Sequence, residues 1–340
     1  MDLVKKIPKN ATVQFVFFGL LLCTLPFLTS AGIMPVATLT ILAGVLFYSI
    51  AALGLNLLLG YSGLVSLGTA GFMGLGAYMA AYFTMVLGAN FWIALAMAII
   101  TPAALGIIIG LVSLRASGLY LGIMTLCLSE ILLQTFKQFG EFTGGMSGRR
   151  AAYPIIFGTQ LDRESTFIVV VIALVLSMIF MHNITKGHAG RAFHAMRGSE
   201  AASQAMGVHL IKYRLVAFAL STAMAGLAGA MYVFYIRHAF PTTWSLELSL
   251  WMVAAVVIGG FRSIYGTVIG CFVVWGVSDL FLRRLPVIGD IPSLPFIFNG
   301  VLIIIVIMKY PHGFIKLFHD LKGLATKAFD RPGQDKGGAA

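Results

Sequence analysis

The sequence predicts an all-α polytopic membrane protein with about 8–10 transmembrane helices, some of them broken or re-entrant. Of its 340 residues, 59% are hydrophobic and only 10% are charged, whereas soluble domains carry about 25% charged residues. Glycine is abundant, at 38 residues, as is usual where membrane helices pack closely. A water-soluble domain could not bury this much apolar surface, so lipid must be the solvent for most of the chain.

Apolar runs set the expected spans. Ten of them approach the length that crosses a hydrocarbon core of about 30 Å, at 12–29, 36–59, 64–88, 91–113, 118–137, 165–182, 214–237, 247–261, 264–281 and 295–309. The eighth is short and the third is broken by glycines, so either could be re-entrant. The first resembles a signal peptide but is long for one, which favours a retained helix.

Charge gives the expected orientation and domain layout. If all ten runs cross, 16 Lys and Arg residues lie on the side of the N-terminus and 6 on the other side, which favours cytoplasmic termini. Residues 1–11 are then a cytoplasmic segment, 12–309 the membrane domain with a cytoplasmic loop at 183–213, and 310–340 a partly disordered cytoplasmic tail. The net charge of +11 therefore follows topology, and nucleic-acid binding is not expected.

Enzyme chemistry is not expected in this chain. The histidines lie in loops or at the ends of spans, with no H-E-x-x-H motif and no nucleophile beside a base. The three cysteines show no paired spacing, so neither a disulfide framework nor a metal site is expected. The sequence contains no Gly-Lys pair and hence no phosphate-binding P-loop. Any ATP hydrolysis must therefore come from another polypeptide.

The polar stretch GSEAASQAMGVHLIKYR, at 198–214, predicts a short cytoplasmic helix. Ser199 is a typical N-cap, Glu200 suits the first turn, and Gly207 can end the helix. The residues expected to share a small, nearly flat face are Ala201, Ala202, Ala205 and Met206. A helix shorter than about 12 residues is marginal in water, so something must hold it. We expect it to dock in a groove; the alternative is a connector on the membrane surface.

A basic side precedes this helix. Arg191, His194 and Arg197 recur at intervals of three residues. We expect them to form a basic face at the cytoplasmic headgroups rather than a specific contact.

The glycine-rich segment LLGYSGLVSLGTAGFMGLGAYMAAY, at 58–82, predicts unwound backbone that lines a pathway. The uncharged residues expected along this pathway are Asn56, Ser62, Ser66, Gly68, Thr69 and Tyr78. Such a lining suits a neutral or zwitterionic solute; the alternative for any one glycine is tight helix packing.

Glu130 is the acidic residue that lies deepest within an expected span, and Gln134 lies one turn later. An intramembrane carboxylate is a candidate functional group, so Glu130 is added to the pathway residues. The alternative is a neutral, structural hydrogen bond with Gln134.

An ordered set of segments resembles the ABC importer permeases for branched-chain amino acids, the LivM-type subunit. In the cytoplasmic loop the matching positions are Gly190, Arg191, Arg197, Glu200, Ala201, Ala202, Gly207 and Tyr213. The other segments are LGLNLLLGYSGLVSLGTAGFMGLGAY (53–78), ASGLYLGIMTL (116–126), FTGGMSG (142–148), VVIGGFRSIYGTVIG (256–270) and KYPHGF (309–314).

The resemblance implies a permease in the bacterial cytoplasmic membrane whose cytoplasmic helix sits in a cleft of an ATPase subunit. It also implies the partners: a second, homologous permease chain, two ATPase subunits that use ATP and Mg, and a periplasmic binding protein. No cofactor is then expected in this chain. The implied solutes are branched-chain or hydrophobic amino acids, with urea or short amides as the alternative. An ion-coupled secondary transporter is the remaining class, and it would usually show acidic relays.

Overall fold

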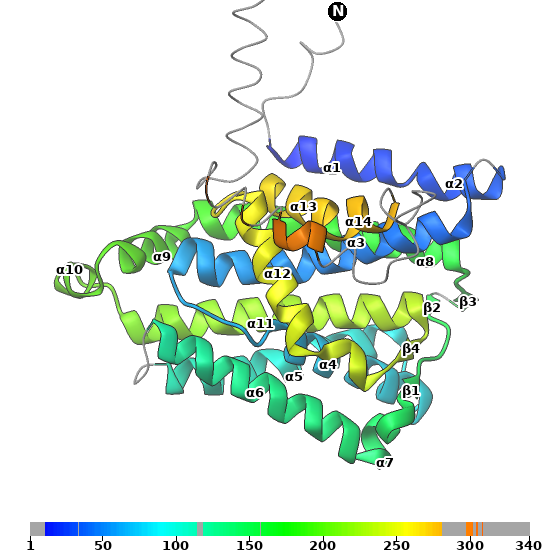
Figure 1. Cartoon of the computed structure of the whole chain (residues 1–340), viewed down its shortest axis with the longest axis horizontal. Helices are drawn as coiled ribbons and strands as arrows, with labels where there is room; N and C mark the ends of the chain where they lie inside the picture. The colour runs from blue at the N-terminus through cyan, green and yellow to red at the C-terminus, as the bar shows by residue number, and fades with distance from the viewer. Residues whose placement is uncertain are drawn as a thin grey trace, which may run out of the picture.

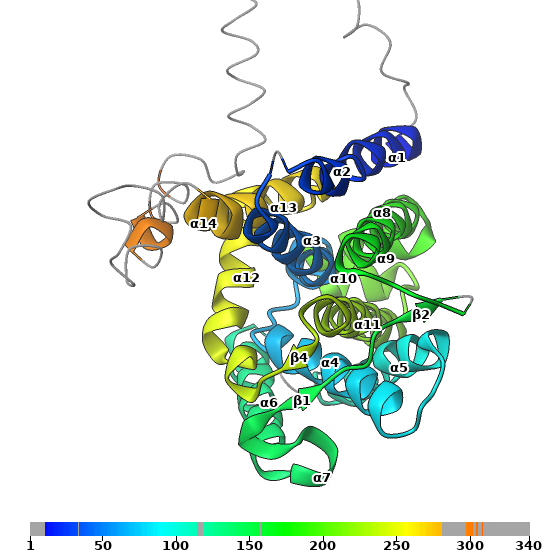
Figure 2. The same cartoon turned by 90° about the vertical axis from the view of Figure 1, so that its right-hand side faces the viewer.

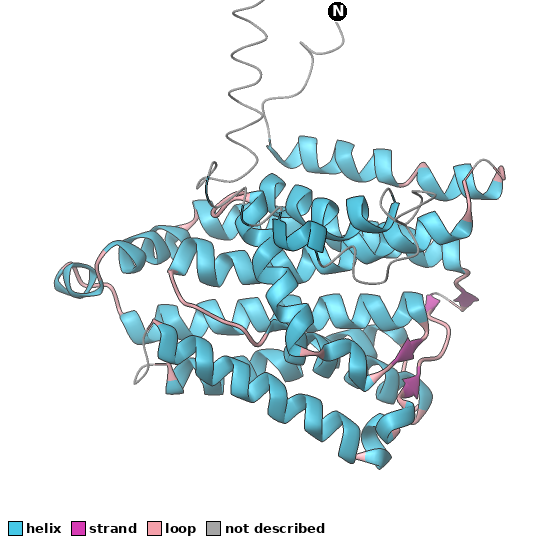
Figure 3. Ribbon diagram, viewed as in Figure 1, coloured by secondary structure: helices cyan, strands magenta, loops and turns pink. Residues whose placement is uncertain are grey.

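A computed structural model of the chain describes residues 11–32, 34–113, 118–156, 158–280, 297–301, 304 and 308. These residues form a helical bundle with a few two-residue strands (Figures 1 and 3). The α-helices are α1 (Ala11–Leu22), α2 (Leu25–Ser30), α3 (Val36–Asn56), α4 (Thr69–Met85), α5 (Phe91–Val112), α6 (Leu119–Gln138), α7 (Gly140–Thr143), α8 (Arg163–Lys186), α9 (His188–Gly198), α10 (Glu200–Ala205), α11 (Leu210–Ile236), α12 (Leu246–Gly259), α13 (Ile264–Cys271) and α14 (Ser278–Leu280).

Shorter elements complete the fold. Two π-helical segments, η2 (Leu57–Ser62) and η5 (Phe272–Val277), continue α3 and α13. Two 3-10 turns lie in connecting loops, η3 (Gly145–Ser147) and η4 (Pro241–Trp244). The strands pair antiparallel, β1 (Arg149–Arg150) with β4 (His238–Ala239), and β2 (Ile155–Ile156) with β3 (Thr159–Gln160).

Six helical segments of the described chain are long and apolar enough to cross a membrane: Ala11–Ser30, Val36–Ser62, Phe91–Val112, Leu119–Gln138, Arg163–Lys186 and Leu210–Ile236. Shorter apolar segments lie beside them in α4, α12 and the run from α13 to α14. An all-α polytopic membrane fold is therefore confirmed. Three of the expected parts, 1–11, the tenth run 295–309 and the tail 310–340, lie wholly or largely outside the described residues.

The expected breaks occur where glycine and local hydrogen bonding disrupt the α-helix. The second run continues as a π-helix to Ser62 and ends at Gly63, which has a φ of 72°. The third run becomes helical only at Thr69, after a non-helical segment at 64–68. The eighth run is confirmed as short, since the 14 residues of α12 cover only about 21 Å.

The connecting loops divide between the two ends of the bundle. In Figure 1, α9 and α10 project at one end, whereas α7 and the strands lie at the other. The first helix, α1, runs from near the middle of the bundle toward the end that carries the strands. The segments 138–165 and 237–247, which the charge pattern places on one side of the membrane, meet through the β1–β4 pair. The loop arrangement thus agrees with the relative topology expected from the sequence.

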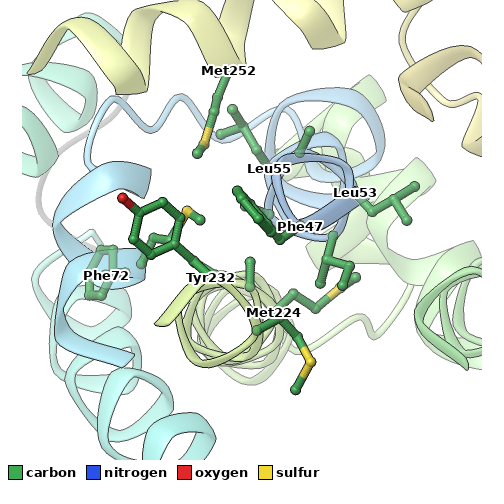
Figure 4. Close-up of a cluster of buried hydrophobic side chains, with 14 of the residues drawn as sticks. Phe47, Leu53, Leu55, Phe72, Met224, Tyr232 and Met252 are labelled. Atoms are coloured by element: carbon green, nitrogen blue, oxygen red, sulfur yellow. The ribbon is translucent and has the colours of Figure 1, made fainter. Parts of the chain in front are cut away.

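The core lies where α3, α4, α11 and α12 meet (Figure 4). The Phe47 and Tyr232 rings pack edge to face with centroids 5.2 Å apart. Small residues bring α11 against its neighbours, because a Cβ atom at Gly229 would overlap the carbonyl group of Met73. This close approach of small residues fixes α4 beside α11.

Candidate functional site

The short helix α10 lies at the tip of the projecting loop, as the sequence predicts. Ser199 is its N-cap, and its Oγ accepts a hydrogen bond of 3.3 Å from the Ala202 N–H. Gly207, with a φ of 84°, follows the helix. All four residues of the alanine face are exposed: Ala201, Ala202, Ala205 and Met206. Ser203 is the buried residue of α10, so the alanine face is open to a partner.

A buried arginine holds this helix to the bundle. Arg214, in the first turns of α11, is 6% exposed and pairs with the carboxylate of Glu200. Its other terminal nitrogen donates a 2.9 Å hydrogen bond to the carbonyl oxygen of Ser113. Ser113 is the C-cap residue of α5. Because the guanidinium has five donors in a fixed plane, it can bridge two elements at once. One side chain therefore ties α10 to both α5 and α11.

The preceding helix α9 is also held by an arginine. Arg197 donates to the carbonyl oxygens of Leu59 and Gly60 in η2. Arg262, in the turn between α12 and α13, donates from its Nε to the same Gly60 carbonyl at 3.2 Å. These carbonyls lie at the end of a helix, where cations are favourable. The two arginines thus join α9 and the α12–α13 turn to the end of the broken span.

The three residues expected to form a basic headgroup face, Arg191, His194 and Arg197, are all exposed, and they differ in their contacts. Arg191 is exposed, and its Nη2 atom lies 2.8 Å from Nδ1 of His188. His194 packs against the Tyr61 ring, with centroids 5.5 Å apart. Partial burial and the charges of Arg262 and Arg197 lower the pKa of His194. Arg197 makes the specific contacts described above, which the sequence alone did not favour.

Asn56 lies at the centre of a buried polar cluster at the end of α3. Its amide donates to Thr267 Oγ1 at 2.7 Å and to the Ser263 carbonyl at 3.2 Å. Its oxygen accepts from the Arg262 N–H at 3.1 Å. The Tyr61 hydroxyl donates to the Arg262 carbonyl at 2.7 Å. These bonds hold Arg262 in the left-handed region, at a φ of 65°, which is unusual for a residue with a side chain.

The N-terminus of α4 starts inside the bundle, and neighbouring helices supply its caps. The Ala70 N–H donates to Ser249 Oγ of α12 at 3.0 Å. The Gly71 N–H donates to Ser129 Oγ of α6 at 3.1 Å. The residue before the cap, Leu67, donates its N–H to Thr125 Oγ1 at 2.9 Å. Backbone groups that lipid could not satisfy are thus satisfied by hydroxyls.

The other candidate pathway residues are distributed along the broken segment. Ser62, Ser66, Gly68 and Thr69 are buried around the non-helical residues. A Cβ atom at Gly68 would lie 2.5 Å from the Thr125 carbonyl oxygen, so a side chain at this position would clash with the α6 backbone.

Tyr78 is fully buried farther along α4. Its hydroxyl donates to the Ala239 carbonyl of β4 at 3.2 Å, and its ring packs against Phe136 at 4.8 Å. In this chain Tyr78 therefore joins α4 to the strand end of the bundle.

Glu130 lies on the outward side of α6, apart from the cluster around Asn56. Its carboxylate accepts a 2.6 Å hydrogen bond from the Gln134 amide, as expected from their spacing, and the pair is exposed. The groove on this side has a volume of about 570 Å³ and includes Cys127 and Gln138.

Some residues that hydrogen-bond the site are distant from it in the sequence and were not predicted. They are Ser113, Thr125, Ser129, Arg214, Ser249, Arg262 and Thr267. Each contacts a residue at least 58 positions away, apart from the ion pair of Arg214 with Glu200. The opposite charges of Glu200 and Arg214 at the two ends of one loop were the signal that could have revealed that pair.

Several known proteins have sequences similar to this one. The family described as "Branched-chain amino acid transport system / permease component" matches residues 37–307. The high-affinity branched-chain amino acid transport system permease protein LivM of Salmonella typhimurium is 29% identical over 317 residues, covering 86% of this chain and 72% of that protein.

Two archaeal proteins of Methanocaldococcus jannaschii are also similar. A probable branched-chain amino acid transport permease protein LivH is 27% identical over 256 residues, covering 70% of this chain and 79% of that protein. A probable LivM is 25% identical over 234 residues, covering 65% and 68% respectively. No solved structure matches the chain. Because the family match spans most of the bundle described above, the chain belongs to the permease-component family of branched-chain amino acid transport systems.

Proposed function

We propose that this chain is the membrane-spanning permease subunit of an ATP-driven importer for branched-chain or other hydrophobic amino acids. The observation that carries the proposal is the exposed alanine face of α10 at the tip of the cytoplasmic loop. The missing P-loop and the family membership support ATP hydrolysis in a separate subunit. The location is then a bacterial cytoplasmic membrane with both termini inside.

In this proposal, α10 docks in a groove of the ATPase, and the ion pair of Glu200 with Arg214 transmits its movement. Arg214 passes a displacement of α10 to the start of α11 and, through Ser113, to the end of α5. Arg197 passes a displacement of α9 to η2, where the broken span ends. Rigid connections of this kind can convert movement of a short helix into movement of whole spans.

The partners follow from this arrangement. Two ATPase subunits that use ATP and Mg would bind α10 and its counterpart in a second, homologous permease chain. An external binding protein would deliver the solute to the strand end of the bundle. The uncharged polar groups around the broken segment support a zwitterionic or neutral solute, since no charged side chain among Asn56, Ser62, Ser66 and Thr69 would repel it.

The docking role can be tested with Ala202→Trp in the complete transporter. Ala202 is exposed in this chain, so the bundle should tolerate the substitution, whereas a groove fitted to alanine should not. We expect solute-stimulated ATP hydrolysis to fall at least about tenfold, which corresponds to about 1.4 kcal/mol. Ile155→Trp is the matched control, because Ile155 is 57% exposed at the opposite end. Full stimulation in the Ala202→Trp complex would show that α10 is only a connector.

A further inference from the structure

We infer that the outward face of α6 is the surface through which this chain meets a homologous permease chain inside the membrane. This inference rests on the proposed function, because it names the surface that binds one of its partners. The α6 face is defined by Tyr120, Ile123, Cys127, Glu130, Gln134 and Gln138.

The residues of the α6 face recur at intervals of three or four, so they form one stripe along the helix. All of them are exposed, with Tyr120 at 77% and Ile123 at 56%. From Glu130 onward the stripe is polar, with Glu130, Gln134 and Gln138, which is unusual for a span that would face lipid. The buried residues on the other side of α6, such as Ser129 and Thr125, already bond to the start of α4.

Glu130 lies at the depth where a lipid-facing carboxylate is least favourable. It follows Leu119, the first residue of α6, by about 16 Å along the helix axis. The hydrocarbon core is about 30 Å thick, so Glu130 lies near its middle. The Gln134 amide occupies one carboxylate oxygen at 2.6 Å, and the remaining acceptor sites need donors that lipid cannot supply.

Other exposed faces of the bundle have the composition that lipid favours. On α5 the exposed large residues include Ile100, Ile107 and Ile108, and on α8 they include Ile172 and Leu176. Figure 2 shows α5 and α8 on one side of the bundle, and α6 and α12 on the opposite side. The exposed surface of α5 and α8 is therefore apolar, whereas the opposite side of the molecule carries the polar stripe of α6.

Helix α12 adds a second carboxylate to the α6 side. Glu247 is exposed in its first turn and accepts a hydrogen bond from the Trp251 indole at 3.2 Å. Both carboxylates are thus bound by a donor one turn later on their own helix. Glu247 ends the loop 237–247 and so lies at the membrane boundary, whereas Glu130 lies at mid-depth, so Glu130 is the carboxylate that favours a protein partner over lipid.

The depth of the α6 face selects the partner. An ATPase subunit and an external binding protein lie outside the hydrocarbon core, so neither can cover Glu130. A second permease chain spans the membrane over the length of α6. This chain is similar to both LivH and LivM of one organism, which supports pairing between two permeases of one fold. The covering helix must offer hydrogen-bond donors near Glu130 and apolar contacts near Ile123.

Site-directed photo-crosslinking in membranes of cells that express the complete transporter tests this surface. The photoreactive residue p-benzoylphenylalanine replaces Ile131, which is 61% exposed beside the α6 face. The matched control carries it at Ile172, which is 51% exposed on α8. We expect an adduct with the second permease chain from position 131 and none from position 172. An adduct from position 131 with lipid, with residues of this chain or with a non-permease protein would overturn the inference.

A second variant tests the polar groups directly. Gln134→Leu removes the donor to Glu130 and leaves a residue that lipid accommodates well. We expect the recovery of the second permease chain with this chain to fall about three- to tenfold, the range for one or two interhelical hydrogen bonds. Unchanged recovery in detergent would show that the stripe is not an interface.

The two proposals fail in different ways. A transporter that couples ATP hydrolysis to import, yet gives no adduct from position 131, would overturn the α6 interface alone. If this chain forms the adduct with the second permease chain, yet solute import does not depend on ATP, the proposed function would be overturned and the interface would stand.

Discussion

Asn56 in α3 donates a hydrogen bond of 2.7 Å to Thr267 in α13, although the two residues are separated by 211 positions in the sequence. The same amide group holds the Ser263 carbonyl and the Arg262 N–H. Asn56 therefore uses both ends of its amide to join the last turn of one span to the turn before another. Together with the bonds of Arg262 to Tyr61 and Gly60, this side chain joins the broken span to the α12–α13 turn.

Replacing Asn56 by Leu should destabilise the fold strongly. The substitution leaves the Arg262 N–H without its partner and removes the amide bonds to Thr267 and to the Ser263 carbonyl, which still accepts from Thr267. An unsatisfied buried group costs about 1–3 kcal/mol. We expect a loss of about 3 kcal/mol, measured as a lower thermal midpoint in detergent. Ser177→Ala is the control, because the Ser177 hydroxyl bonds only within its own helix, to Ala173. Equal midpoints for the two variants would contradict a central role for Asn56.

Removing one cap of α4 should destabilise the fold less than replacing Asn56, and this loss can be measured separately. Ser249→Ala removes the acceptor for the Ala70 N–H and should cost about 1 kcal/mol, the usual value for a lost N-cap. Ser177→Ala is again the matched control, since the Ser177 hydroxyl donates to the Ala173 carbonyl of its own helix. Thermal unfolding of both variants provides the comparison. A Ser249→Ala midpoint equal to that of Ser177→Ala would show that α4 needs no cap from α12.

The sequence predicts the long helices well because their signal is local. The run expected at 91–113 is α5, Phe91–Val112, and the run expected at 118–137 is α6, Leu119–Gln138. For these two helices, apolar length places both ends to within one residue. The short helix at 198–207 was also predictable, because the N-cap at Ser199 and the glycine after the helix are local signals.

The polar contacts could not be predicted in the same way. Ser249 and Ala70 are 179 positions apart, so their contact exists only after the helices pack. The π-helical end of α3 was missed for a related reason. Asn56 and Gly60, at the start of this segment and within it, accept bonds from Arg262, and no periodicity in the sequence reports such bonds. Apolar patterning therefore predicts the spans, whereas tertiary packing sets their ends.

The ion pair of Arg214 with Glu200 should contribute to coupling more than to stability. The Glu200 side chain is 48% exposed, so solvent screens the pair and limits it to about 1 kcal/mol. Arg214→Met, by contrast, also loses the bond to Ser113. We expect Glu200→Gln to unfold close to the wild-type temperature and to reduce solute-stimulated ATP hydrolysis severalfold.

A double-mutant cycle of Glu200→Gln and Arg214→Met separates the pair from its surroundings. Both ATP hydrolysis and thermal midpoint are measured for each variant. If the two substitutions act independently on coupling, the pair does not transmit the movement of α10.

The environment of His194 predicts a dependence of stability on pH. Partial burial, followed by the charges of Arg262 and Arg197, lowers the pKa of His194 below its ordinary value of 6.5. The groups that face it are Arg197 on its own helix, Arg262 from the α12–α13 turn and the Tyr61 ring of η2. Below pH 6.5 the unfolded chain binds a proton that the folded chain resists, so folding is progressively less favourable as the pH falls.

This contribution to stability is complete above pH 6.5 and is lost as the pH falls toward the lowered pKa of the folded protein. We therefore expect the thermal midpoint of the wild type to fall more between pH 7.5 and 5.5 than that of His194→Gln, which has no charge to gain. The measurement is a series of unfolding curves over this range at constant salt, since ionic strength screens the two arginines. Parallel pH profiles for the two proteins would show that contacts of η2 with α9 do not depend on a neutral imidazole at position 194.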